Sequence, residues 1–155
     1  MDSFLRGKPF YGREWLFGKL IHYLELKNQA QIPGVLLVGG PGAGKSAACA
    51  EICFPTVVIS PQAQLNSRLL AYHFCQFHEA ESLTADYFVQ NILGQLEESS
   101  LMPEFAEKWS LAQDSLISSD PKEIFLKILE VVKFLFFKQD FKLERAGFII
   151  LFNKT

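Results

Sequence analysis

The sequence predicts an α/β fold in which helices flank a mainly parallel sheet. The first observation is an apolar, partly β-branched run, Val35 to Val38, which suits a strand buried on both faces. The second is the glycine-rich loop after it, which leads into an alanine-rich, helix-favouring stretch from Ser46 to Ile52. The third is that further strand candidates alternate with helical patterns along the chain. Such alternation is typical of parallel sheets.

The other strand candidates differ in quality. Residues 56–60 (TVVIS) have strand-like composition but are bracketed by Pro55 and Pro61, and the residues after them look like a loop. Residues 68–75 (RLLAYHFC) alternate better, and residues 148–152 (FIILF) form a compact apolar run after Gly147. We therefore expect the sheet to combine these runs with residues 35–38.

Helical patterns fill most of the remaining chain. Residues 11–27 repeat apolar positions at intervals of three and four, which predicts an amphipathic helix with Trp15 in the core. Ser82 is expected to cap a helix that runs to about residue 98, and residues 102–118 to contain a short helix. Asp120 and Pro121 are a favoured helix start, and the apolar pattern of residues 124–137 predicts a core helix.

The glycine-rich loop matches the spacing G-x-x-x-x-G-K-[ST] at Gly39, Gly44, Lys45 and Ser46. Glycines let successive backbone N–H groups turn around a phosphate, and the helix that follows adds its positive end. Lys45 would neutralise the β- and γ-phosphates, while the Ser46 hydroxyl would bind Mg²⁺. The alternative is a glycine-rich turn with no ligand, but its position between a strand and a helix favours a P-loop, the Walker A motif.

Composition limits the classes of partner. The chain has 155 residues, enough for one domain, and 49% of them are hydrophobic. The net charge of −2 gives no basic excess, which argues against a nucleic-acid partner. The most apolar stretch, residues 124–137, is too short to span a bilayer and is interrupted by three charged residues. With no apolar signal-peptide core at the N-terminus, we expect a cytoplasmic protein without a membrane span.

The cysteines allow two interpretations. Three are present (Cys49, Cys53 and Cys75), an odd number that is typical of reduced thiols in a cytosolic protein. A zinc site that includes His73 and His78 is conceivable. However, the chain has no C-x-x-C pair, so buried thiols are the better interpretation.

Two further segments support a resemblance to a known family. The opening Gly12-Arg13-Glu14-Trp15 and the AYHFCQ stretch of residues 71–76, together with the loop, resemble the P-loop domain of TANC-type ankyrin-repeat scaffolds in the STAND class of NTPases. The resemblance covers roughly residues 10–135. It implies an N-terminal segment (1–11), a partial P-loop domain (12–137) and a divergent tail (138–155).

The resemblance also implies a ligand. It places the Gly-Arg-Glu segment beside the base and sugar of ATP or ADP, bound with Mg²⁺, and it implies unidentified protein partners. Without the resemblance, Arg13 and Glu14 read as ordinary charges at a helix start. The predicted nucleotide-binding residues are Tyr11, Arg13, Gly39, Gly40, Pro41, Gly42, Ala43, Gly44, Lys45, Ser46 and Ala47.

The sequence departs from the family where a hydrolytic enzyme needs an acid. A working P-loop NTPase has an apolar strand that ends in an Asp for Mg²⁺. Here residues 134–137 are followed by Lys138, Gln139 and Asp140, and residues 148–152 by Asn153. We therefore expect a chain truncated before that strand, whose tail is a replacement ending, and enzymatic activity stays uncertain.

Three functions follow from these observations. The first is an ATP- or ADP-binding module of a scaffold protein, without efficient hydrolysis. The second is a nucleotide-free fragment that associates through an exposed Phe-rich helix at residues 124–137. The third is a small NTPase or kinase that uses Asp140 or another acid, which the lack of an acidic strand end disfavours.

Overall fold

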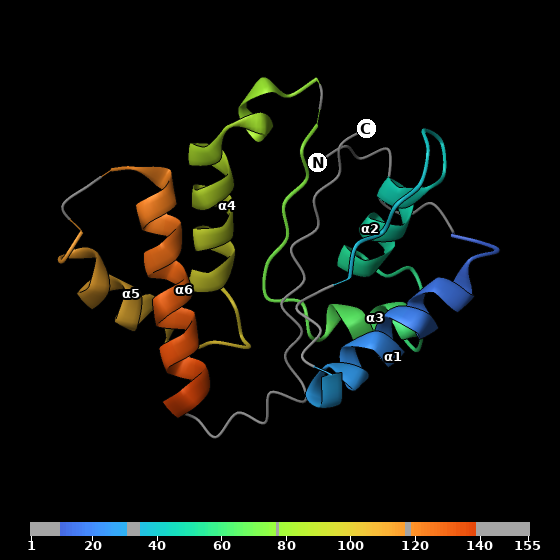
Figure 1. The fold of residues 1–155 in the computed structure, drawn as a ribbon, viewed down its shortest axis with the longest axis horizontal. Helices are drawn as coiled ribbons and strands as arrows, with labels where there is room; N and C mark the ends of the chain where they lie inside the picture. Colours follow the sequence, from blue (N-terminus) through green and yellow to red (C-terminus); the bar gives the residue numbers. More distant parts are fainter. Residues whose placement is uncertain (1–9, 31–34, 77, 117–118, 139–155) are drawn as a thin grey trace.

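Helices account for all the regular structure of the described residues. The structure, a computed structural model, describes residues 10–30, 35–76, 78–116 and 119–138. In chain order (Figure 1) its elements are α1 (Glu14–Ala30), α2 (Lys45–Cys53), α3 (Pro61–Asn66), the 3₁₀ helix η1 (Ala80–Leu83), α4 (Ala85–Glu97), α5 (Phe105–Gln113) and α6 (Pro121–Lys138). None of these helices combines the length and the apolarity needed to cross a membrane.

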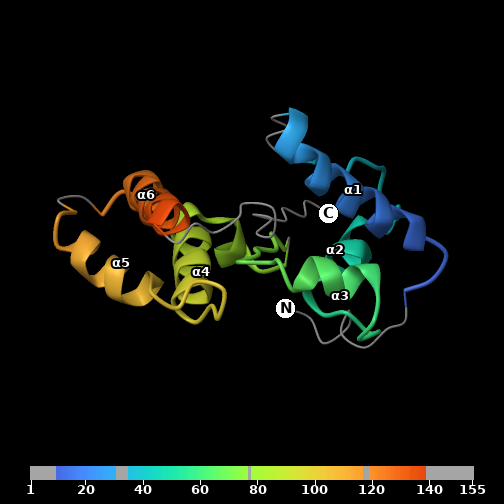
Figure 2. The same cartoon turned by 90° about the horizontal axis from the view of Figure 1, so that it is seen from below.

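The helices form two groups. Helix α3 packs against α1 and α2, whereas α4 packs against η1, α5 and α6. An extended segment that includes residues 69–76 runs between the two groups (Figures 1 and 2). The glycine-rich loop belongs to the first group, because it leads directly into α2.

The first group has a small core. Phe17 of α1 and Leu65 of α3 are fully buried, and Ala48 and Ile52 of α2 complete the cluster. Phe10 packs against this cluster, with its ring centroid 5.3 Å from that of Phe17. The expectation that Trp15 lies in the core is wrong, since its side chain is 59% exposed. The apolar stripe of α1 passes through Phe17 instead, on the opposite side.

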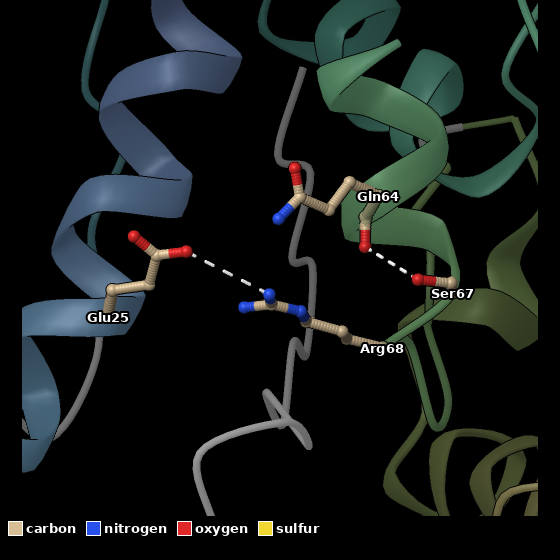
Figure 3. Close-up of polar contacts among 4 residues, drawn as sticks. All are labelled: Glu25, Gln64, Ser67 and Arg68. Carbon is tan, nitrogen blue, oxygen red and sulfur yellow. Dashed lines mark hydrogen bonds and ion pairs between the residues drawn. The ribbon is translucent and has the colours of Figure 1, made fainter. Parts of the chain in front are cut away.

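A polar contact joins α1 to the end of α3. Arg68 lies 3.9 Å from Glu25 across the gap between the two helices (Figure 3). The Ser67 hydroxyl donates to the backbone carbonyl of Gln64 at 2.9 Å. Because the Glu25 side chain is exposed and the separation is long, this ion pair contributes about 0–1 kcal/mol, and the apolar contacts hold the group together.

The second group has the larger core. Helix α6 buries Ile128, Val132 and Leu135 on one stripe, against α4 and α5. Phe105 of α5 is fully buried there and stacks on Trp109. The predicted core helix is thus confirmed, and so is its start. The Asp120 carboxylate accepts a hydrogen bond from the Lys122 N–H at 3.1 Å, and Pro121 is the first helical residue.

Two helix starts differ from the predictions. Thr84, rather than Ser82, caps α4 by accepting a hydrogen bond from the Tyr87 N–H at 3.3 Å. Residues 61–66, expected to form a loop, are α3, in which the Ser60 hydroxyl accepts a hydrogen bond from the Ala63 N–H at 3.1 Å. In both helices a hydroxyl one residue before the helix satisfies an otherwise unpaired donor.

The predicted parallel sheet is wrong for the described residues, which contain no strand. Residues 35–38 and 57–59 are not helical, but they do not pair, and Val58 and Ile59 are 88% and 94% exposed. A strand requires a neighbour that supplies backbone hydrogen bonds, which composition alone does not guarantee. The candidate at residues 148–152 lies outside the described residues, as do Asp140 and nearly all of the tail.

The strand candidate at residues 68–75 finds a different partner, in a segment that is extended from residue 69 to residue 76. The side-chain amide of Gln95 accepts a hydrogen bond from the Tyr72 N–H at 3.0 Å and donates one to the Tyr72 carbonyl at 2.7 Å. A side chain of α4 therefore takes the place that a neighbouring strand would have at this residue. Because a P-loop NTPase presents its loop from a sheet, the P-loop NTPase and Walker A assignments are corrected together with the fold class.

Candidate functional site

The glycine-rich loop folds into a tight turn before α2. The Ala43 N–H donates to the Gly40 carbonyl at 3.2 Å. Gly42 and Gly44 have φ angles of 73° and 76°, a left-handed conformation that side chains disfavour. Gly44 is the N-cap of α2, with no side-chain hydrogen bond to the first turn. The backbone of the loop thus leads directly into the N-terminus of α2, the positive end of the helix dipole.

Lys45 folds back across this loop. Its ammonium group donates hydrogen bonds to the carbonyls of Gly39 at 2.7 Å and Gly40 at 2.9 Å. A Cβ placed on Gly39 would lie only 3.0 Å from the Cβ of Ala43, so the loop is nearly closed on itself. The lysine charge therefore lies against the backbone of a compact loop.

Arg13 reaches the same loop from the start of α1. Its Nη1 atom donates a hydrogen bond to the carbonyl of Ala43, 30 residues further along the chain. The guanidinium group also lies over Gly44, where an added Cβ would be 3.1 Å from Nη1. Within the part of the chain that the structure describes, neither Arg13 nor Lys45 forms an ion pair with a carboxylate.

The other predicted binding residues surround these two cations. Pro41 is an exposed turn residue between Gly40 and Gly42. Ser46 and Ala47 are half-buried in the first turn of α2. Tyr11 is 79% exposed and precedes Arg13 by two residues. The structure thus brings Arg13 to the loop, while Tyr11 faces solvent.

One buried acid near the site was not predicted. Glu51 of α2 is buried, and its carboxylate accepts hydrogen bonds from the Thr56 N–H at 2.9 Å and the Thr56 hydroxyl at 2.7 Å. Those bonds replace the water that the charge loses on burial, and they fix the turn after α2. Nothing in the spacing of the sequence marks this pair.

His73 is a buried structural residue. Its Nε2 atom lies 2.9 Å from the Ser82 carbonyl, and its Nδ1 atom lies 3.2 Å from the Asn91 side-chain nitrogen. These contacts fit a neutral ring that donates from Nε2 and accepts at Nδ1, so both nitrogen atoms are engaged. No cluster of three or more His, Cys, Asp or Glu residues in the described ranges could hold a metal ion.

Cys49 and Cys53 are buried on α2 beside Phe74. Burial raises the pKa of Cys49 to about 11. The pKa of Cys53 is raised as well, first by burial and then by the neighbouring Cys49. A thiol with a raised pKa is a poor nucleophile at neutral pH, so these two cysteines act as small core residues.

Comparison with known families matches residues 5–151 of the chain to the family described as Nephrocystin 3, N-terminal. The chain belongs to the nephrocystin 3 N-terminal family. This family takes the place of the TANC-type relatives indicated by the sequence motifs. The match covers every described residue, so the glycine-rich loop and both cations lie within the matched part of this chain. Neither the curated proteins nor the solved structures contain a significant match.

Alanine substitutions in the loop should show how much backbone strain and side-chain crowding each lower the free energy of unfolding. Gly42→Ala and Gly44→Ala each force a Cβ into a left-handed conformation and should lower the free energy of unfolding by about 1–2 kcal/mol. Gly44→Ala should cost more, because its Cβ also displaces Arg13. Gly40→Ala, with a free Cβ position and no positive φ, is the control. Urea denaturation measures all three, and equal losses would contradict this ordering.

Proposed function

We propose that this chain is a nucleotide-binding module that holds the phosphates of ATP or ADP, with Mg²⁺, against its glycine-rich loop. The observation that carries the proposal is the convergence of Lys45 and Arg13 on one loop. Both cations bind only neutral backbone carbonyls there, and no carboxylate pairs with either in the described part of the chain. Two unneutralised positive charges beside a helix N-terminus favour an anion.

A phosphate group would compete well for these cations. A phosphate oxygen carries the opposite charge to the Lys45 ammonium, so Lys45 gains Coulomb attraction by exchanging neutral carbonyls for phosphate oxygens. The Ser46 hydroxyl, in the first turn of α2, would bind the Mg²⁺ that accompanies the nucleotide. Tyr11, exposed near Arg13, offers an aromatic face for the base.

We further propose that the module binds without efficient hydrolysis. Phosphoryl transfer needs a carboxylate that anchors Mg²⁺ or orients the attacking water. No Asp or Glu of the described residues pairs with Lys45 or Arg13. Glu51, the buried acid of α2, is occupied by Thr56.

Association through the Phe-rich helix has less support. The apolar stripe of α6 already packs against α4 and α5. Phe134 is half exposed, but the Lys108 ammonium lies 5.9 Å from the centre of its ring. The packed stripe is therefore not available to a partner, and Leu126 and Phe134 are the large apolar side chains of the described part of this helix that remain about half exposed.

Lys45→Met should weaken the binding of Mg²⁺-ATP and Mg²⁺-ADP by about tenfold or more, because it removes a charge-assisted contact to phosphate. Lys133→Met, on the exposed side of α6, makes the same change of charge away from the loop. Isothermal titration calorimetry gives both dissociation constants, with circular dichroism as the check of folding. The proposal fails if the folded native chain binds neither nucleotide, or if both variants lose affinity equally.

A further inference from the structure

Arg13 lies against the glycine-rich loop, which is the phosphate end of the proposed site. Its guanidinium donates to the Ala43 carbonyl and lies over Gly44, the residue that begins α2. Lys45, which follows Gly44 directly, binds the other end of the same loop. Since that loop is nearly closed on itself, the two cations act on a single small group of backbone atoms.

The packing of α1 holds Arg13 in this position. The Arg13 carbonyl accepts a hydrogen bond from the Leu16 N–H at 2.9 Å, so its backbone is joined to the first turn of α1. Four residues after Arg13, the fully buried Phe17 packs α1 against α2 and α3. The guanidinium is therefore directed to the loop by the core of the first helical group.

We infer that Arg13 is a second phosphate ligand, which exchanges the Ala43 carbonyl for phosphate oxygens when a polyphosphate binds. The inference rests on the proposed nucleotide-binding function and assigns Arg13 a role that the sequence resemblance places elsewhere, at the base and sugar. A guanidinium presents two parallel N–H groups that match phosphate oxygens, so the exchange replaces one bond to a neutral acceptor with two to an anion. Recognition by Arg13 then requires no base at all.

The test compares a nucleotide with a polyphosphate that lacks base and sugar. Native protein, Arg13→Gln and Arg13→Lys are titrated by calorimetry with ATP and with inorganic tripolyphosphate. Arg13→Gln should raise the dissociation constants of ATP and of tripolyphosphate by the same factor, about tenfold. The affinities of Arg13→Lys should lie between those of the native protein and Arg13→Gln, because lysine keeps the charge and loses the paired geometry. Lys133→Gln is the control for a general effect of charge.

Three outcomes would overturn the inference. If Arg13→Gln weakens ATP but leaves tripolyphosphate unchanged, Arg13 serves the base or sugar. If Lys45→Met lowers the affinity for tripolyphosphate and Arg13→Gln does not, the loop binds phosphate without Arg13. The proposed function then holds and the inference about Arg13 fails. If the folded native chain binds neither ligand, the proposed function and the inference fail together.

Discussion

Replacing Phe105 with alanine is expected to lower the free energy of unfolding by about 3–5 kcal/mol, the cost of removing a large buried aromatic side chain. Phe105 is fully buried where α4, α5 and α6 meet, and its ring is stacked on Trp109 with centroids 6.4 Å apart. Removing the ring leaves a cavity that surrounding helices fill only in part. A domain of this size has about 5–15 kcal/mol of stability in total, so the second helical group should approach unfolding.

The same helix provides the matched control for Phe105. Leu111 of α5 is 63% exposed, and Leu111→Ala should change stability by no more than about 0.5 kcal/mol. Urea unfolding followed by tryptophan fluorescence measures both variants, because the buried Trp109 reports directly on this group. Similar losses for Phe105→Ala and Leu111→Ala would show that α5 is not packed as described.

Raising the pH from 9 to 11 is expected to destabilise the fold by about 2 kcal/mol through Cys49. The pKa of this thiol rises from 9.0 to about 11 on folding, because burial disfavours the thiolate. Above pH 9 the unfolded chain releases the proton while the native chain keeps it, so stability falls with rising pH. Below pH 9 both states are protonated and the contribution is fully present. Cys53, whose pKa is also raised, acts in the same direction.

Replacing the two cysteines separates the effect of their thiols on stability at high pH from that of other groups that titrate there. Cys49→Ala and the double variant with Cys53→Ala should show a flatter dependence of the unfolding free energy on pH above 9 than the native chain. Urea denaturation at a series of pH values measures the slopes. Identical slopes for the native chain and the double variant would mean that these thiols are accessible to solvent in the folded state.

Local signals predicted several helices well. The start of α6 at Asp120 and Pro121 was readable because a cap needs only neighbouring residues. The same pattern at Ser60 and Pro61 begins α3, but the apolar run before it drew the interpretation towards a strand and loop. Trp15 was assigned to the wrong side of α1, because apolar residues at helical spacing occur on both sides of this helix.

The sheet could not be judged from local pattern, because strand pairing depends on residues far apart in the sequence. Residues 35–38 have the composition of a buried strand, yet they lie exposed and unpaired in the described structure. The site was partly readable. Glycine spacing located the loop and Lys45, whereas the contact of Arg13 with Ala43 spans 30 residues, which no spacing rule covers. Only the family resemblance had linked Arg13 with a nucleotide, and it placed Arg13 at the base and sugar rather than at the loop.

The pairing of Gln95 with Tyr72 has a consequence for solubility. An extended, apolar stretch with open backbone groups is a template on which copies of a chain can add to one another and aggregate. Residues 69–76 are extended and largely apolar, but Leu70, Ala71 and Phe74 are buried. Both polar groups of the Tyr72 backbone are also engaged by the Gln95 side chain. Gln95 is itself held by the Asn91 side chain. Burial and the Gln95 side chain thus together protect the centre of the segment against intermolecular strand addition.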